Sequence, residues 1–274
     1  ENWSLYHMDR RIKRLEKLLK KSASRNFIDK VLTKLAINDF FSSFSKNLLP
    51  LYSKISANDV SPNFEKNTKE LIGKLKSYMF DGYWVGSYFL EKKEIISLNY
   101  DSKTYVKEEI KKFLDDTMKD VLAKQNVKYY LEKNTWNILW FDKILEFYPD
   151  AKMVHIYRDP RDVVASFVKQ TWMPSDIDQS ALIYKDLIKK WTDIKMRISK
   201  DSYIEIALEE LVLDSKATLE KICKFYEIDF QDALLSVKLN KSNSNRWKKD
   251  FSKEEQLRIN KLLSDEIKAF GYDA

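Results

Sequence analysis

The stretch MVHIYRDPRDVVAS, residues 153–166, contains the signals of a strand, a turn and the start of a helix. Its first five residues are apolar and β-rich, which predicts a buried strand. Asp159 is a good helix N-cap, and Pro160 is tolerated at the first helical position. Asp162 lies where the free N–H groups of a helix start favour an acid. We therefore predict a strand followed by a helix that runs from Asp159 to about residue 170.

Strands and helices alternate on both sides of this stretch. Strand-like runs occur at 127–131 and 202–206, and helical periodicity covers 101–124, 135–147, 178–199, 216–226 and 253–270. This order is typical of parallel βαβ units, in which helices cover both faces of the sheet. The sequence therefore predicts an α/β fold with three layers, a parallel sheet flanked by helices.

The first hundred residues lack this alternation. Apolar residues recur at helical spacing over 8–21, 26–48 and 63–80. An aromatic cluster at 78–89 would form either core or the wall of a ligand pocket. Because no low-complexity linker interrupts the chain, we predict a single domain over 1–274. Residues 1–100 would form its helical N-terminal lobe and 101–274 its α/β part.

Composition excludes several kinds of site. One cysteine, Cys223, and two distant histidines, His7 and His155, cannot form a typical zinc site, so we predict no metal. The four glycines do not form a Gly-rich phosphate loop of the Rossmann or Walker type. Neither an apolar run of about 18 residues nor a secretory signal pattern is present. We therefore expect a cytoplasmic protein without a membrane partner.

The positive charge is concentrated at the start of the chain. Residues 1–30 contain nine Lys and Arg against four Asp and Glu, which accounts for five of the seven net positive charges. Such a patch is either a solvated helix face or a surface for polyanions. A basic helical polyanion-binding protein is therefore an alternative function, although it leaves residues 151–166 unexplained.

Arg158 is the first candidate binding residue. It follows a predicted parallel strand and precedes a helix N-terminus, which is where α/β proteins bind ligands and where anions are favoured. Its planar guanidinium matches a phosphate group. Ser166 lies two turns further along the helix and could add a hydroxyl donor. The alternative is that Arg158 pairs with a carboxylate of the protein.

Three segments, in the same order and at similar spacing, resemble the PAPS-dependent sulfotransferase family. PAPS is 3′-phosphoadenosine 5′-phosphosulfate, and PAP is the bisphosphate that remains after transfer. The segments are LEKNTWNILWFDKILEFYPDAKMVHIYRDPRDVVASFVKQTW (131–172), IALEELVLDSKATLEKICKFYEI (206–228), and NRWKKDFSKEEQ with IKAFGY (245–272). The resemblance covers about residues 103–274 and implies a P-loop NTPase-like fold, with nucleotide binding in residues 101–274 and the acceptor region in the lobe.

The resemblance also implies roles for single residues. Arg158 and Ser166 match the family's ligands for the 3′-phosphate, and Arg246 matches a late basic segment that closes over the same nucleotide. Lys133 matches a lysine near the site of sulfuryl transfer. Glu1 stands about where some branches carry a glutamate that acts as general base on the acceptor.

Parts of the family pattern are missing. Asn134 and Thr135 replace the usual Thr-Pro, and Leu208 stands where a tyrosine is frequent. The glycine-containing loop that binds the 5′-phosphosulfate through its main-chain N–H groups has no counterpart in this sequence. We expect that loop upstream of Glu1, and we expect the 274-residue chain alone to be inactive.

These observations predict an enzyme, a sulfotransferase that moves a sulfuryl group from PAPS to a hydroxyl or amine. The acceptor would be a small molecule, a carbohydrate or another compound with such a group. We expect no metal and no nucleic-acid partner, and the sequence leaves the oligomeric state open. The alternative is a non-catalytic relative that keeps the nucleotide-binding half and binds a partner through the helical lobe.

Overall fold

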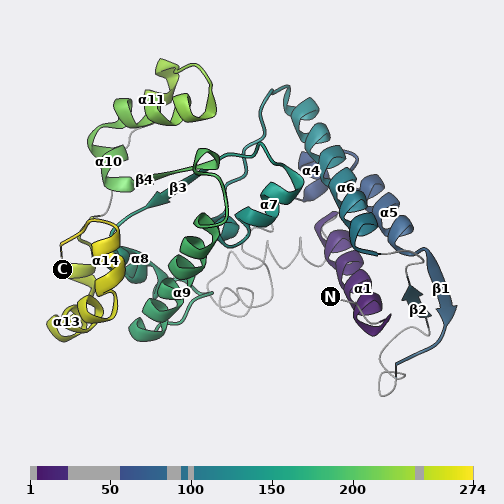
Figure 1. The fold of residues 1–274 in the computed structure, drawn as a ribbon, viewed down its shortest axis with the longest axis horizontal. Helices are drawn as coiled ribbons and strands as arrows, with labels where there is room; N and C mark the ends of the chain where they lie inside the picture. The colour runs from purple at the N-terminus through teal and green to yellow at the C-terminus, as the bar shows by residue number, and fades with distance from the viewer. Residues whose placement is uncertain (1–4, 24–55, 85–93, 98–101, 238–243, 274) are drawn as a thin grey trace, which may run out of the picture. The chain divides into compact units, whose positions relative to one another are not determined.

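Figure 1 shows a computed structural model of the chain, which describes residues 5–23, 56–84, 94–97, 102–237 and 244–273. The chain divides into two compact units, Glu1–Glu132 and Lys133–Ala274, and each has its own hydrophobic core. The helix expected over 26–48 lies outside the described residues. The single domain expected from the sequence stays a prediction.

The first unit combines helices with one hairpin of strands. Its described elements are α1 (Leu5–Ala23), α4 (Ala57–Val60), α5 (Phe64–Leu75), β1 (Tyr78–Asp81), β2 (Glu94–Ser97) and α6 (Ser102–Gln125). The helices predicted over 8–21 and 101–124 are confirmed. The helix predicted over 63–80 is too long, because residues 78–81 pair antiparallel with β2 instead. A partner strand thus overrides the helical spacing at the end of that segment.

A buried acid connects α1 to the hairpin. Asp9 is fully buried, and its carboxylate accepts hydrogen bonds from Ile96 N at 3.0 Å and Trp84 Nε1 at 2.8 Å. It also pairs with Lys13 at 3.0 Å. Since a buried charge is tolerated only with such partners, Asp9 fixes α1 against β2.

The second unit carries the predicted strand–helix stretch. Its described elements are η1 (Thr135–Leu139), α7 (Phe141–Phe147), β3 (Met153–Tyr157), α8 (Pro160–Phe167), α9 (Ile177–Lys195), η2 (Lys200–Ser202), β4 (Tyr203–Ala207), α10 (Leu208–Leu213), α11 (Ser215–Tyr226), η3 (Asp232–Ser236), α12 (Trp247–Asp250), α13 (Lys253–Leu262) and α14 (Ser264–Ala269). The η elements are 3₁₀-helices. The main core of this unit packs α8 and α9 against α12, α13 and α14.

β3 and β4 form a parallel pair, with Met153 opposite Tyr203 and Tyr157 opposite Ala207. Figure 1 shows the two strands side by side, as expected for a βαβ unit. The strand expected over 127–131 is wrong, because these residues join no ladder and Val127, Tyr129 and Leu131 are exposed. A β-rich run forms a strand only where a neighbour satisfies its main-chain groups. Among the described residues the sheets are two-stranded, so the three-layer parallel sheet stays a prediction.

A partly buried polar cluster joins the two parallel strands to α9. His155 and Glu205 lie opposite each other in the register, and His155 Nδ1 lies 3.0 Å from Glu205 Oε1. Trp191 Nε1 and Lys195 Nζ each donate to the same carboxylate at 2.8 Å. Burial opposes ionisation of Glu205, but hydrogen bonds from His155, Lys195 and Trp191 outweigh it and lower the pKa of this carboxyl to about 2.

The C-terminal helix ends in a glycine-dependent cap. Gly271 has a φ of +77°, in the left-handed region that other residues rarely adopt. Gly271 N donates to Lys268 O at 3.0 Å, and Tyr272 N donates to Ile267 O at 2.9 Å. This is a Schellman motif, which satisfies the last carbonyl groups of α14. The following Tyr272 donates its hydroxyl to Glu209 Oε2 at 2.8 Å and so connects the C-terminus to α10.

We predict that acid weakens the second unit through Glu205. Its folded-state pKa lies below the value of 4.5 for a free glutamate, so its stabilisation is complete above pH 4.5 and is lost as the pH falls towards 2. The loss should be on the order of 2–3 kcal/mol of unfolding free energy. Urea unfolding at pH 3 and pH 6 measures it. Glu205→Gln should show a smaller difference between the two pH values, and an equal difference would contradict this account.

We predict opposite effects from two glycine-to-alanine changes. Gly271→Ala should destabilise the chain by about 1 kcal/mol, because alanine is strained in the left-handed region. Gly73→Ala lies inside α5, where an added Cβ meets no atom within 4 Å, so it should stabilise by about 0.5–1 kcal/mol. Melting curves of both variants and the parent give the two shifts. A neutral or stabilising Gly271→Ala would argue against the capping motif.

Candidate functional site

The turn between β3 and α8 has the local structure that its sequence predicts. Asp159 is the N-cap of α8, and its side chain accepts from Arg161 N at 2.9 Å. Pro160 occupies the first turn, where no N–H is needed. Arg158 therefore lies directly after the last residue of a parallel strand and beside a capped helix N-terminus.

Arg158 is half-buried and keeps most of its guanidinium donors available. Its Nη2 donates to the main-chain carbonyl of Asp162 at 2.7 Å. Among the described residues, no carboxylate lies within ion-pair distance of this guanidinium. The structure thus does not support the alternative that Arg158 serves as the partner of a protein carboxylate. A half-buried arginine without such a partner is suited to an anionic ligand.

The second arginine of the turn has a different environment. Arg161 is 6% exposed and pairs with Asp159 through its Nε and Nη2 atoms, at 2.7 Å for Nη2. Its Nη1 donates to Asn260 Oδ1 at 3.0 Å, and its Nη2 also donates to the carbonyl of Asp273 at 2.8 Å. The guanidinium lies 4.3 Å from the ring centre of Trp247. Protein groups thus occupy Arg161, and its role is to join α8 to the C-terminal segment.

Asp162 connects the turn to the region of Arg246. The sequence suggested that this acid serves its own helix start, but Asp159 fills that role. The Asp162 carboxylate instead accepts from Asn245 N and from Trp247 N, both at 2.9 Å. Burial raises the pKa of Asp162, and the hydrogen bonds from the two amides partly offset the effect.

Arg246 lies between these two amides, at the start of α12. Its side chain is exposed and pairs through Nε with Asp250 Oδ2 at 2.9 Å. Asp250 also pairs with Lys169, which follows α8. α12 packs on α8, so residues almost ninety positions apart in the sequence belong to the same part of the second unit.

Ser166 lies in the last turn of α8 and is half-buried. Within the described residues its hydroxyl has no hydrogen-bond partner, so it is available to a ligand. The indole N–H of Trp247 is a further buried donor without an acceptor. An unsatisfied buried donor costs about 1–3 kcal/mol, and a ligand that accepts from it would remove that cost.

The remaining predicted residues are not joined to this group. Lys133 is exposed and precedes η1, whose N-cap Asn134 accepts from Trp136 N at 3.0 Å. Among the described residues, no hydrogen bond or ion pair connects Lys133 to Arg158, Ser166 or Arg246. Glu1 lies outside the described residues. The structure therefore brings Arg158, Ser166 and Arg246 into one part of the fold. The roles of all five residues stay predictions.

Sequence reasoning missed that the Asp162 carboxylate binds the main chain around Arg246. It also missed the buried indole N–H of Trp247, which has no acceptor among the described residues. Both depend on contacts between the turn and a segment more than eighty residues away. The available signal was the occurrence of two acids in the turn, of which a helix start needs only one. The second acid, Asp162, was therefore free to serve another segment.

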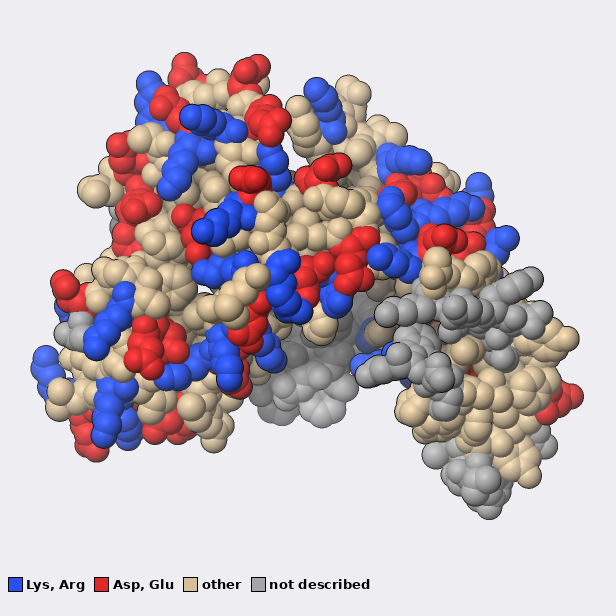
Figure 2. Space-filling model, in the orientation of Figure 1, with Lys and Arg blue, Asp and Glu red and all other residues tan. Residues whose placement is uncertain are grey.

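The charges around this site are balanced. Residues 133–274 contain 24 Lys and Arg and 24 Asp and Glu, and Figure 2 shows both kinds interspersed over α9, α11, α13 and α14. A general basic field does not exist in this unit, so attraction of an anion has to come from the local arrangement at Arg158.

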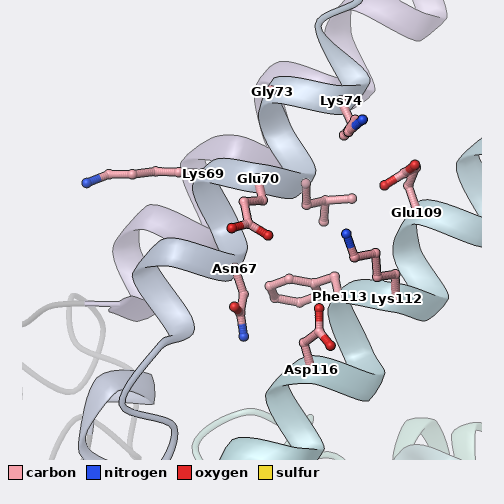
Figure 3. Close-up of a pocket in the computed structure, with 10 residues that line it drawn as sticks. Asn67, Lys69, Glu70, Gly73, Lys74, Glu109, Lys112, Phe113 and Asp116 are labelled. Carbon is pink, nitrogen blue, oxygen red and sulfur yellow. The ribbon is translucent and has the colours of Figure 1, made fainter.

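A separate cleft lies in the first unit, between α5 and α6 (Figure 3). It has a volume of about 450 Å³, and Leu71 and Phe113 contribute its buried apolar part. Its other side chains carry both signs of charge, including Lys112 and Asp116. Of the predicted site residues that the structure describes, none lines this cleft, so it is distinct from the group around Arg158.

Two kinds of feature are missing from the described part of the chain. No group of three His, Cys, Asp or Glu side chains there could hold a metal ion, and the absence of a metal stays a prediction. Within the same residues, no helix has both the length and the apolar character to cross a bilayer.

Comparison with known proteins gives three findings. A family model described as the sulfotransferase family matches residues 85–232, more than half of the chain. A protein-tyrosine sulfotransferase of Drosophila melanogaster is 29% identical over 109 residues, which cover 36% of this chain and 21% of that protein. The chain thus spans about a fifth of the length of that relative.

Among solved structures, a sulfotransferase domain from the curacin biosynthetic pathway is similar. It has 15% sequence identity and a TM-score of 0.38, with 76% of this chain and 78% of that chain covered. The match to the family model includes β3, the turn with Arg158, and the whole of α8 and β4. The chain belongs to the sulfotransferase family.

Proposed function

We propose that this protein is a PAPS-dependent sulfotransferase that transfers a sulfuryl group to a hydroxyl or amine. The observation that carries the proposal is Arg158, a half-buried guanidinium with no carboxylate partner among the described residues, beside the N-terminus of α8. Family membership supports the reaction type. The partial likeness to a protein-tyrosine sulfotransferase supports a hydroxyl acceptor.

The side chains around Arg158 fit the 3′-phosphate of PAPS or PAP. A phosphate accepts hydrogen bonds at several oxygens, and Arg158 and Ser166 offer donors that protein groups leave available. Arg246 adds a second guanidinium, of which only Nε is engaged with Asp250 among the described residues. Since plain adenylates lack a 3′-phosphate, these residues would distinguish PAPS from them.

Bound PAPS would supply the sulfuryl group. The chain's own part in the reaction is positioning and charge compensation, because an in-line displacement gathers negative charge that cationic donors stabilise. Lys133 would provide such a donor near the transferred group, and Glu1 would accept the proton of the acceptor. Neither role requires a metal ion.

Arg158→Ala should weaken binding of PAP while leaving adenosine 5′-monophosphate almost unaffected. Truncating one partner of a buried charge pair costs roughly 2–5 kcal/mol, which corresponds to about 30- to several-thousand-fold in affinity. Arg158→Lys should also lose affinity, because a point charge cannot reproduce a two-pronged guanidinium contact. Ser166→Ala should lose less, about 1.5–3 kcal/mol. Titration calorimetry of the full chain with both nucleotides measures these changes.

Arg197→Ala is the matched control for the loss of a positive charge. Arg197 lies in the same unit, is 61% exposed and pairs with Asp142 at 3.3 Å, so its replacement should leave both affinities unchanged. Melting curves on the same samples exclude unfolding as the cause of a loss. Equal losses for the two nucleotides, or an unchanged PAP affinity in folded Arg158→Ala, would contradict the assignment.

A further inference from the structure

Asp162 is a buried acid whose side chain serves a segment far along the chain. The residue is 1% exposed, and its two carboxylate oxygens accept from Asn245 N and Trp247 N. These amides stand on either side of Arg246. The carboxylate therefore holds the main chain before and after that arginine, although it makes no hydrogen bond with the guanidinium itself.

The held segment has a main-chain geometry that needs support. Asn245 has a φ of +60°, in the left-handed region, and Arg246 follows with helical angles of −62° and −36°. Asparagine tolerates that region better than other residues with a side chain, but it also adopts the commoner regions readily, so surrounding contacts hold it in this one. Two hydrogen bonds to a buried carboxylate are contacts of this kind.

The same residue also contacts the other predicted phosphate ligand. The main-chain carbonyl of Asp162 accepts from Arg158 Nη2 at 2.7 Å. One residue thus connects both arginines, Arg158 through its carbonyl oxygen and the main chain of Arg246 through its carboxylate. The carbonyl contact does not depend on the side chain. A side-chain substitution of Asp162 therefore removes support from the main chain of Arg246 and leaves the acceptor of Arg158 in place.

We propose that Asp162 is a positioning residue, which sets the main chain of Arg246 so that its guanidinium binds the 3′-phosphate held by Arg158. The inference rests on the proposed function. Arg246 is suited to this role because Asp250 engages only its Nε, which leaves the terminal nitrogens to a ligand. Asp162 acts through Arg246 and does not itself contact the nucleotide.

Asp162→Asn is the first test, because it keeps the shape of the side chain. An amide offers one acceptor oxygen and places its own N–H₂ group against the second main-chain N–H, so one of the two bonds is lost. PAP affinity of the full chain should fall about 10- to 100-fold, the range for losing hydrogen bonds to a charged group. Adenosine 5′-monophosphate should bind as before. Asp178→Asn, at a half-exposed acid paired with Arg258, is the control and should change neither affinity.

Amide hydrogen exchange tests the contact without any nucleotide. In the parent protein the amides of Asn245 and Trp247 should exchange slowly, and in Asp162→Asn at least one should exchange faster while the amides of α9 stay protected. Unchanged exchange at both positions would overturn the positioning role, whatever the nucleotide affinities.

A double-mutant cycle shows whether Asp162 acts through Arg246. Arg246→Ala alone should weaken PAP binding, and adding Asp162→Asn to it should change the affinity by less than about twofold, because the two changes remove the same contact. If the loss of PAP affinity in the double variant equalled the product of the two single losses, Asp162 would act by another route, and the proposal would be refuted.

A second pair of variants keeps the proposal testable if Asp162→Asn does not fold. Asn245 is exposed, so replacing it leaves the core intact. Asn245→Gly preserves access to the left-handed region and should keep PAP affinity, whereas Asn245→Val disfavours that region and should lower it about tenfold or more. Equal affinities for the two variants would contradict a role for this geometry.

The outcomes separate this inference from the proposed function. If Arg158→Ala leaves PAP affinity unchanged in a folded protein, the nucleotide assignment itself is wrong. If Arg158→Ala weakens PAP binding but Asp162→Asn does not, the nucleotide assignment stands and the positioning role of Asp162 is wrong.

Discussion

A carboxylate that leaves water must find donors within the protein, and Asp162 finds them in two main-chain amides that lie 83 and 85 residues further along the chain. This contact fixes where the segment 244–250 lies on α8. It also determines where the side chain of Trp247 enters the core and where Arg246 begins α12. The arrangement of the candidate site thus follows from the need of one buried acid for hydrogen bonds.

The two arginines of the turn have different environments, and the sequence around them does not indicate which arginine has which environment. Arg161 is enclosed by Asp159, Asn260, the Asp273 carbonyl and the ring of Trp247, so its charge is used inside the protein. Arg158 has one hydrogen bond to a carbonyl and no carboxylate partner among the described residues. An ion pair between Arg158 and a protein carboxylate would compete with a phosphate for the guanidinium. The carboxylate of Asp159 is instead paired with Arg161. The absence of a carboxylate partner at Arg158, within the described part of the chain, therefore depends on its neighbour Arg161.

Charge is used differently in the two units. The whole net charge of +7 belongs to residues 1–132, where 25 basic residues face 18 acidic ones, while residues 133–274 are balanced at 24 of each. The nucleotide binding proposed for the second unit would therefore rely on a few directed donors, whose interactions are less screened by salt than those of an exposed basic surface. The first unit holds its fully buried acid, Asp9, with one main-chain amide, an indole N–H and the ammonium group of Lys13.

Features that depend only on neighbours in the chain are the ones that could be predicted from the amino-acid order. The apolar run 153–157 gave a strand, Asp159 and Pro160 gave a capped helix start, and both could be predicted because their interactions span only a few residues. Long-range packing determines which arginine is enclosed by protein groups, which acid serves a distant segment, and that 127–131 joins no ladder. These outcomes depend on partners up to 112 residues away, and spacing within a short window carries no information about whether such partners meet.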